Sequence, residues 1–298
     1  MSRIVFKFSH LHVWVLRTSS GLCLILGMTL ALSGCAWLDA KQRELLFRPT
    51  PGAPAAFTGL RSGDLSFATE VPGVEPGTRH TLQMWWLPHA SPQAPTLLYL
   101  HGTYRNLYLN LPKIDALREA GFAVLAVDYR GWGDSTPIVP SETTIYADAD
   151  TAWAELVRRQ PDARKRVIYG HSMGGGVAVD VASRKRHGTD YGALILESTF
   201  TNGVDVAAAG GWLARLLAHF STQKFNSIDK IGKVDAPVLM LHGDADKTVP
   251  VALGRKLRDA APAGTLWVEF AGGSHSRLQS EAPAAYQNAL KALLARLG

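Results

Sequence analysis

Hydrophobic residues occur along this chain in two alternating kinds of segment. Short apolar runs predict buried strands, and longer segments with apolar residues three or four positions apart predict helices. Glycine and proline separate many of the segments. The expected strands are 65–71, 81–87, 96–100, 122–128, 167–169, 193–196, 238–241 and 266–270. The expected helices are 111–120, 146–160, 174–186, 251–260 and 283–297.

This alternation predicts the α/β fold class, with a mostly parallel central sheet and helices on both of its faces. The first two strands lack an intervening helical pattern, so we expect them to be antiparallel. In an open sheet of this kind, ligands bind beyond the carboxyl ends of the strands. Candidate functional residues are therefore sought directly after the expected strands.

The first 34 residues have the pattern of an export signal. Arg3, Lys7 and Arg17 precede the uncharged, mostly apolar stretch Gly21–Leu32, whose 12 residues are too few for a comfortable membrane span. The following Leu32-Ser33-Gly34-Cys35 resembles a bacterial lipobox. It predicts cleavage before Cys35 and a lipid on that cysteine. The alternatives are an ordinary signal peptide and an uncleaved anchor.

Lipidation implies a protein of the bacterial cell envelope, held on the membrane by its N-terminus. Ala36 stands where an aspartate would favour inner-membrane retention, so the resemblance favours the outer membrane, facing the periplasm. Residues 35–60 then form a tether and linker, and 61–298 form the folded domain. The predicted mature chain keeps one cysteine, so no disulfide can form within it.

Composition excludes several classes of function. The formal net charge of +6 falls to +3 once the signal segment is removed, which is too weak to predict nucleic-acid binding. The chain has no His-Glu-x-x-His, Cys-x-x-Cys, phosphate-binding lysine loop or G-x-G-x-x-G. We therefore expect no metal, nucleotide or redox cofactor.

Ser172 is the candidate nucleophile. It lies at the centre of Gly170-His171-Ser172-Met173-Gly174, between an apolar strand and an expected helix. A strand, a tight turn and a helix would expose its hydroxyl above the sheet edge, near the positive end of the helix. The alternative is a harmless serine in a glycine-rich helix start.

A serine nucleophile needs a base, and the base needs a carboxylate to orient it. Asp246 follows the expected strand 238–241, and His275 follows the strand 266–270. Both lie in loops that should gather at the same edge of the sheet as Ser172. Asp244 and Glu197 are alternative acids, although bracing roles for them fit their positions better.

These motifs together resemble the α/β-hydrolase superfamily over residues 73–297. The resemblance rests on His101-Gly102, on the serine motif, and on His242-Gly243-x-x-Asp246-x-x-Val249-Pro250 followed by His275. It is closest to small-lidded serine hydrolases of the esterase and acyl-thioesterase type. It implies an α/β-hydrolase fold, with Asp246 as the acid and His275 as the base.

The resemblance also implies an oxyanion hole of two backbone N–H groups. One comes from Met173, and the other from Thr103 or the adjacent Tyr104. The bulk of Tyr104 and Arg105 suggests a narrowed acyl pocket, with Tyr108 as a further wall.

Residues 199–231 form the longest gap between expected strands, and they carry apolar residues at helical spacing. Either this apolar face packs on the sheet, or the segment is a small lid whose inner side contacts an acyl chain. The apolar residues are Trp212, Leu213, Leu216, Leu217 and Phe220.

We expect a serine hydrolase that cleaves small-molecule carboxylic esters or thioesters through an acyl-enzyme on Ser172. One alternative is a peptidase or amidase that uses the same three residues. Another is a non-catalytic binding lipoprotein of the envelope. A transferase, in which an alcohol replaces water, would share the acyl-enzyme.

Overall fold

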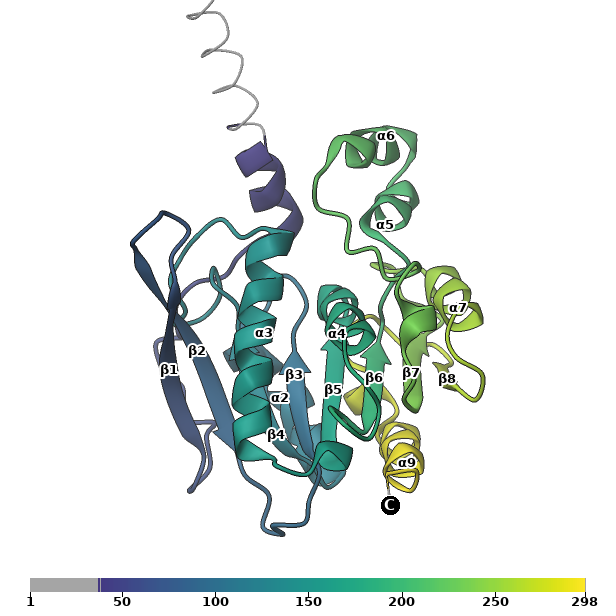
Figure 1. Cartoon of the computed structure of the whole chain (residues 1–298). Coiled ribbons are helices and arrows are strands. Elements are labelled where there is room, and N and C mark those ends of the chain that lie inside the picture. The colour runs from purple at the N-terminus through teal and green to yellow at the C-terminus, as the bar shows by residue number, and fades with distance from the viewer. Residues whose placement is uncertain (1–36, 38, 298) are drawn as a thin grey trace, which may run out of the picture.

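The computed structural model describes residue 37 and residues 39–297, so the expected signal segment and Cys35 lie outside the described residues. Its centre is an eight-stranded sheet in the order β1-β2-β4-β3-β5-β6-β7-β8 (Figure 1). The strands are β1 Leu65–Pro72, β2 Arg79–Leu87, β3 Thr96–Leu100, β4 Ala123–Asp128, β5 Arg166–His171, β6 Ala193–Glu197, β7 Val238–Gly243 and β8 Leu266–Phe270.

Only β2 runs against its neighbours. It pairs antiparallel with β1 and with β4, whereas β3 pairs parallel with β4 and β5, and the series continues in parallel to β8. This pairing confirms the mostly parallel sheet and the antiparallel pair at its start. The carboxyl ends of β3, β5, β6, β7 and β8 consequently meet at one edge.

Helices cover both faces of the sheet, as expected (Figure 1). Alternate strand residues supply the two cores: Leu98 and Leu100 face the core that contains α3 and α4, and Leu97 and Tyr99 face the core of α2 and α9. The helices are α2 Leu107–Glu119, α3 Glu142–Arg159, α4 Met173–Ser183, α5 Gly203–Ala209, α6 Trp212–Phe220, α7 Val251–Asp259, α8 Leu278–Glu281 and α9 Pro283–Leu294. Two short 3₁₀ helices span Ala163–Lys165 and Ile231–Lys233.

Two helices begin four residues earlier than the apolar spacing predicts, because polar caps extend them. The Asn106 side chain accepts a hydrogen bond from the N–H of Leu109, 3.3 Å away, at the start of α2. Ser141 and Thr144 exchange hydrogen bonds of 3.1 and 2.8 Å in a capping box at the start of α3. Neither cap adds an apolar residue to the pattern.

The segment expected to be a tether and linker contacts the domain. Residues 39–47 are helical, and the buried ring of Phe47 packs edge-on against Phe225, 5.9 Å away. Farther along, the N–H of Gly52 donates to the carbonyl of Gly133 over 2.6 Å, and Gly133 donates to Thr50 over 3.0 Å. No helix within the described residues has the length and apolar character needed to cross a bilayer.

Candidate active site

Ser172 lies in a very tight turn between β5 and α4. Its backbone φ is +55°, a left-handed conformation that costs a non-glycine residue of the order of 1–3 kcal/mol. Crowded backbone on both sides fixes the turn. A Cβ on Gly170 would lie 2.2 Å from the carbonyl oxygen of Gly174, and one on Gly174 would lie 2.1 Å from that of Leu100. Both positions therefore require glycine, and the Ser172 side chain is held at the helix N-terminus.

The structure places the three expected side chains in one hydrogen-bonded row. The Nε2 atom of His275 lies 3.0 Å from the Oγ of Ser172, and its Nδ1 lies 2.7 Å from the Oδ2 of Asp246. The residues come from the loops after β5, β7 and β8. This geometry lets the imidazole accept a proton from the hydroxyl while the carboxylate holds the other nitrogen.

Asp246 is held firmly in its ionised form. Burial raises its pKa, but hydrogen bonds from His242 and His275 outweigh that effect and hold the pKa well below its usual range. Its second oxygen, Oδ1, accepts bonds from the N–H groups of Thr248 and Val249, each 2.8 Å long. These bonds fix the carboxylate so that Oδ2 faces the imidazole.

His171 supports the loop that carries His275. Burial, with a further contribution from the nearby Lys113, lowers the pKa of His171 to about 3, so its ring is neutral at pH 7. Its Nε2 lies 2.9 Å from the carbonyl oxygen of His275, and since a carbonyl can only accept, Nε2 carries the hydrogen. The bond ties the base to the serine turn.

The two alternative acids have other partners. The Oδ1 of Asp244 accepts the N–H of Gly272 over 2.6 Å, so this side chain braces two loops. Glu197 is buried and pairs with Lys113; it also accepts hydrogen bonds from the hydroxyls of Tyr169 and Tyr286 at 2.6 and 2.8 Å. Its backbone carbonyl accepts the N–H of Ser172 over 2.9 Å. Asp244 therefore braces two loops, and Glu197 holds α2, β5 and α9 together, whereas His275 is hydrogen-bonded to Asp246.

Backbone donors are available beside the Ser172 hydroxyl. Met173 is the first residue of α4, and Thr103 follows Gly102, where an added Cβ would lie 2.9 Å from the Cβ of Ser172. Within the described part of the chain, neither the N–H of Met173 nor that of Thr103 has a hydrogen-bond acceptor. Two such groups can bind an oxyanion.

An apolar pocket of about 320 Å³ opens directly at Ser172. Phe200, Val206 and Ala207 wall it on one side, which brings α5 into the pocket lining. Trp212 and Leu216 of α6 are exposed to solvent, so neither packs on the sheet. The expected wall residue Tyr108 does not line this pocket, because its hydroxyl donates to Asp134 and its ring packs against Phe57 and Trp85.

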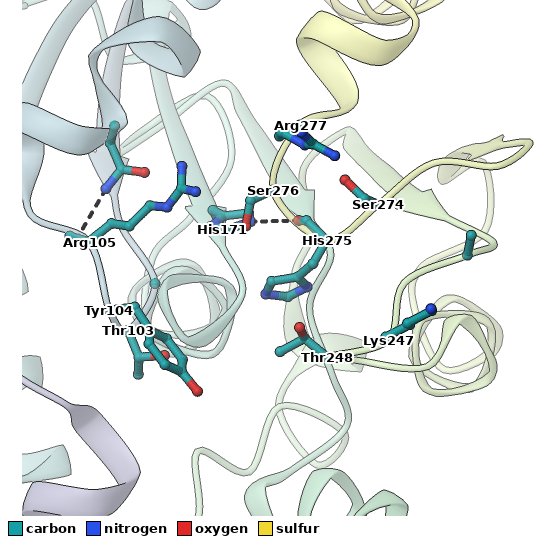
Figure 2. Close-up of a pocket in the computed structure, with 13 residues that line it drawn as sticks. Thr103, Tyr104, Arg105, His171, Lys247, Thr248, Ser274, His275, Ser276 and Arg277 are labelled. Atoms are coloured by element: carbon teal, nitrogen blue, oxygen red, sulfur yellow. Dashed lines mark hydrogen bonds between the residues drawn. The ribbon is translucent and has the colours of Figure 1, made fainter.

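Two features of the pockets were not predicted from the sequence. Residues 45–47 of the N-terminal segment line the apolar pocket. A second cavity of about 510 Å³ lies beside His275 and is lined by Arg105, Lys247 and Arg277 (Figure 2). The sequence could have indicated the second cavity, since each of these three cationic residues stands in a loop that follows an expected strand.

Among the described residues, no group of three His, Cys, Asp or Glu is placed to hold a metal ion.

Comparison with known proteins gives matches over most of the chain. A family model described as serine aminopeptidase, S33 (Hydrolase_4), matches residues 91–229. An uncharacterized protein of Mycobacterium tuberculosis is 32% identical over 241 residues, which cover 80% of this chain and 81% of that protein.

Other similar proteins carry functional names. The lysophosphatidylserine lipase ABHD12 of Danio rerio is 33% identical over 192 residues, which cover 59% of this chain and 50% of the lipase. Among solved structures, an esterase of Pyrococcus furiosus superposes with a TM-score of 0.64 at 19% identity, covering 84% of this chain and 97% of the esterase. At that identity the likeness shows the fold.

Proposed function

Because this chain belongs to the α/β-hydrolase superfamily, we propose that it is a serine hydrolase that cleaves carboxylic esters or thioesters through an acyl-enzyme on Ser172. The observation that carries the proposal is the hydrogen-bonded row of Ser172, His275 and Asp246, whose serine lines an apolar pocket. The pocket takes the acyl chain, and its size favours small to medium acyl groups. The esterase and lipase names among the similar proteins support ester chemistry.

The first half-reaction acylates the serine. The Ser172 Oγ attacks the acyl carbonyl while His275 Nε2 takes the hydroxyl proton, and the fixed Asp246 carboxylate stabilises the resulting imidazolium. The N–H groups of Met173 and Thr103 donate to the oxyanion. His275 then gives its proton to the leaving oxygen or sulfur, whose bond to the acyl carbon breaks.

The second half-reaction releases the acid. A water molecule gives a proton to His275 as its oxygen attacks the acyl carbon of the ester on Ser172. The same two N–H groups hold the second oxyanion. The bond to Oγ breaks, and His275 returns the proton to the serine, so the enzyme is regenerated. Nitrophenyl esters of graded chain length test this cycle. If the enzyme hydrolyses none of them, the proposal is wrong.

Amide cleavage is the second candidate, because the matching family model is described as a serine aminopeptidase. The same three residues can attack a peptide carbonyl. Turnover of an aminoacyl nitroanilide is compared with that of the nitrophenyl ester of the same acid. An amide kcat/KM that equals or exceeds the ester value would replace the ester assignment with a peptidase.

The pocket wall formed by α5 predicts which acyl lengths are accepted. Ala207→Phe fills space that we expect to hold the end of the chain, so kcat/KM for an octanoyl ester should fall about tenfold relative to an acetyl ester. This is the loss of roughly two buried methylenes at about 0.8 kcal/mol each. Nitrophenyl ester kinetics measure the ratio.

Ala209→Phe is the matched control for this change. Ala209 lies two residues farther along α5, is exposed, and does not line the pocket. Its substitution should leave the octanoyl-to-acetyl ratio at the wild-type value. If both variants shift the ratio equally, the wall does not lie at Ala207.

We further propose that a lipid on Cys35 anchors the enzyme to the envelope, in the outer membrane and facing the periplasm. The helical N-terminal segment and α6 stand on either side of the carboxyl edge of the sheet (Figure 1). Both carry exposed apolar side chains, Leu45 and Leu46 on the N-terminal segment and Trp212 and Leu216 on α6. These segments would face the bilayer from which an acyl substrate comes. The insertion 199–231 acts as the small lid of this site.

Lipidation predicts that radiolabelled palmitate is incorporated into the full chain and lost in Cys35→Ser. We expect the labelled protein to sediment with outer-membrane vesicles. The Cys23→Ser variant is the control, because that residue leaves with the signal and its label should persist. Label that survives Cys35→Ser would contradict the anchor.

A further inference from the structure

The cavity beside His275 is chemically unlike the apolar pocket. It measures about 510 Å³, and three cationic side chains line it: Arg105 from the loop after β3, Lys247 from the loop after β7, and Arg277 from the loop after β8. Figure 2 shows Arg105 and Lys247 on opposite sides of His275, with Arg277 above it in this view. No Asp or Glu is among the described residues that line the cavity.

These cations are only weakly compensated. Arg277 lies 3.3 Å from Glu281, but that carboxylate also accepts bonds from the N–H and hydroxyl of Ser274, at 2.8 and 2.7 Å. Within the described residues, neither Arg105 nor Lys247 has a carboxylate within ion-pair distance. Two uncompensated positive charges on opposite walls attract an anion into the space between them.

The cavity and the apolar pocket meet at the reacting atoms. Thr103, Tyr104 and Thr248 line both spaces, whereas Ser172 opens into the apolar pocket and His275 into the cationic cavity. The acyl carbon must lie at the serine, and the leaving atom must lie at the histidine that protonates it. A substrate with its acyl chain in the apolar pocket therefore places its leaving group among the three cations.

We propose that this cavity is a subsite for a phosphate-bearing leaving group, which selects esters or thioesters whose released alcohol or thiol carries a phosphate. The proposal rests on the ester hydrolysis proposed above. A phosphate monoester carries about −1.5 to −2 charges at pH 7 and offers several acceptor oxygens, which suits cations that approach from opposite walls. A leaving group with one carboxylate would use only part of this set.

The balanced reaction remains that of a hydrolase. The bond between the acyl carbon and the leaving oxygen or sulfur breaks, His275 delivers the proton, and the phosphate-bearing alcohol or thiol departs. Water then releases the carboxylic acid. The phosphate itself forms and breaks no bond, so Arg105, Lys247 and Arg277 act as specificity residues that bind the leaving group.

Two hexanoyl esters test the charge preference at a constant acyl chain. The full chain, purified in detergent, is assayed with 1-hexanoylglycerol 3-phosphate and with 1-hexanoylglycerol. We expect kcat/KM to be at least about tenfold higher for the phosphate ester at low ionic strength, and the advantage to shrink at high salt because the Debye length falls from about 10 Å at 0.1 M to about 3 Å at 1 M. Hexanoyl-coenzyme A, as a third substrate, shows whether the phosphate comes from a lipid headgroup or a nucleotide-type thiol.

Removing the positive charges of Arg105 and Lys247 tests whether these residues bind the phosphate. The double variant Arg105→Gln, Lys247→Gln should bring the ratio of the two kcat/KM values close to one. Lys233→Gln, Lys291→Gln is the matched control, because these exposed lysines lie near the opposite edge of the sheet, in the 3₁₀ helix before β7 and in the last turn of α9. The control should keep the wild-type ratio. A wild-type ratio near one, or an equal loss in both double variants, would overturn the subsite.

A binding measurement separates this inference from the proposed reaction. Glycerol 3-phosphate is titrated into the wild-type protein and into the Arg105→Gln, Lys247→Gln variant, with ³¹P NMR as the readout. We expect millimolar or tighter binding by the wild type and at least tenfold weaker binding by the variant. If the wild type binds glycerol 3-phosphate but hydrolyses neither ester, the proposed reaction is wrong and the anion site stands. Hydrolysis of the neutral ester without binding would refute the subsite alone.

Discussion

Ser172→Ala should lower kcat for a nitrophenyl ester by about five orders of magnitude while leaving the protein folded. The Oγ atom is the nucleophile that the imidazole activates, and its removal leaves the Nε2 of His275 without the hydroxyl that now lies 3.0 Å away. Burst kinetics with the wild type should show the acyl-enzyme, and the variant should show no burst. A fluorophosphonate, which bonds to the same oxygen, should label the wild type and not the variant.

A nearby serine provides the matched control. Ser198 follows β6, is buried, and has a positive φ of +50°, and its hydroxyl has no hydrogen-bond partner among the described residues. Ser198→Ala should therefore keep activity within about threefold and change stability little. Equal loss of activity in both variants would mean that disruption of the fold, rather than loss of the nucleophile, explains the first result.

The rate losses caused by substituting the members of this row should also be non-additive, because the residues act in one reaction step. Adding His275→Ala to Ser172→Ala should change the residual rate by less than about threefold, because the histidine has no proton to take once the hydroxyl is gone. Independent losses that multiply would contradict a shared reaction step. No esterase activity in the wild-type protein, by contrast, would favour the non-catalytic binding role considered from the sequence.

The strands and the catalytic candidates were accessible from sequence because their signals are local. Each strand is a short apolar run, and Ser172, Asp246 and His275 each stand within a few residues of a strand end. In a parallel sheet those ends share one edge, so a linear pattern predicts a spatial cluster. Helix starts were less accessible, because polar caps such as Ser141 carry no apolar periodicity.

The walls of the site depend on contacts between distant parts of the chain. Phe47 reaches the apolar pocket through its packing on Phe225, which no local pattern reveals. The apolar residues at helical spacing that the sequence shows clearly lie on α6. The pocket is lined instead by Val206 and Ala207 of α5, which has no such clear pattern. Arg105 was read from the sequence only as bulk that narrows the site. Its charge indicates an anion site only once the fold places Arg105 in the same cavity as Lys247 and Arg277.

Asp246→Asn should have the second largest effect, lowering kcat by about 10⁴-fold with the fold intact. The side-chain oxygen that accepts from Thr248 and Val249 can stay in place, because both bonds are to N–H donors. The new NH₂ group then faces the Nδ1 of His275, where Oδ2 now lies 2.7 Å away. Two donors cannot face each other, so the ring moves its hydrogen to Nε2.

That tautomer points its hydrogen at the Ser172 hydroxyl and has no lone pair there to accept a proton. ¹⁵N NMR of the histidine ring should report the change directly, with Nδ1 protonated in the wild type and Nε2 protonated in Asp246→Asn. Asp244→Asn is the matched control, because an amide oxygen can still accept the N–H of Gly272, so activity should stay within about threefold. If Asp244→Asn were the damaging change and Asp246→Asn the mild one, the acid of the row would have been misassigned, although the nucleophile and base would stand.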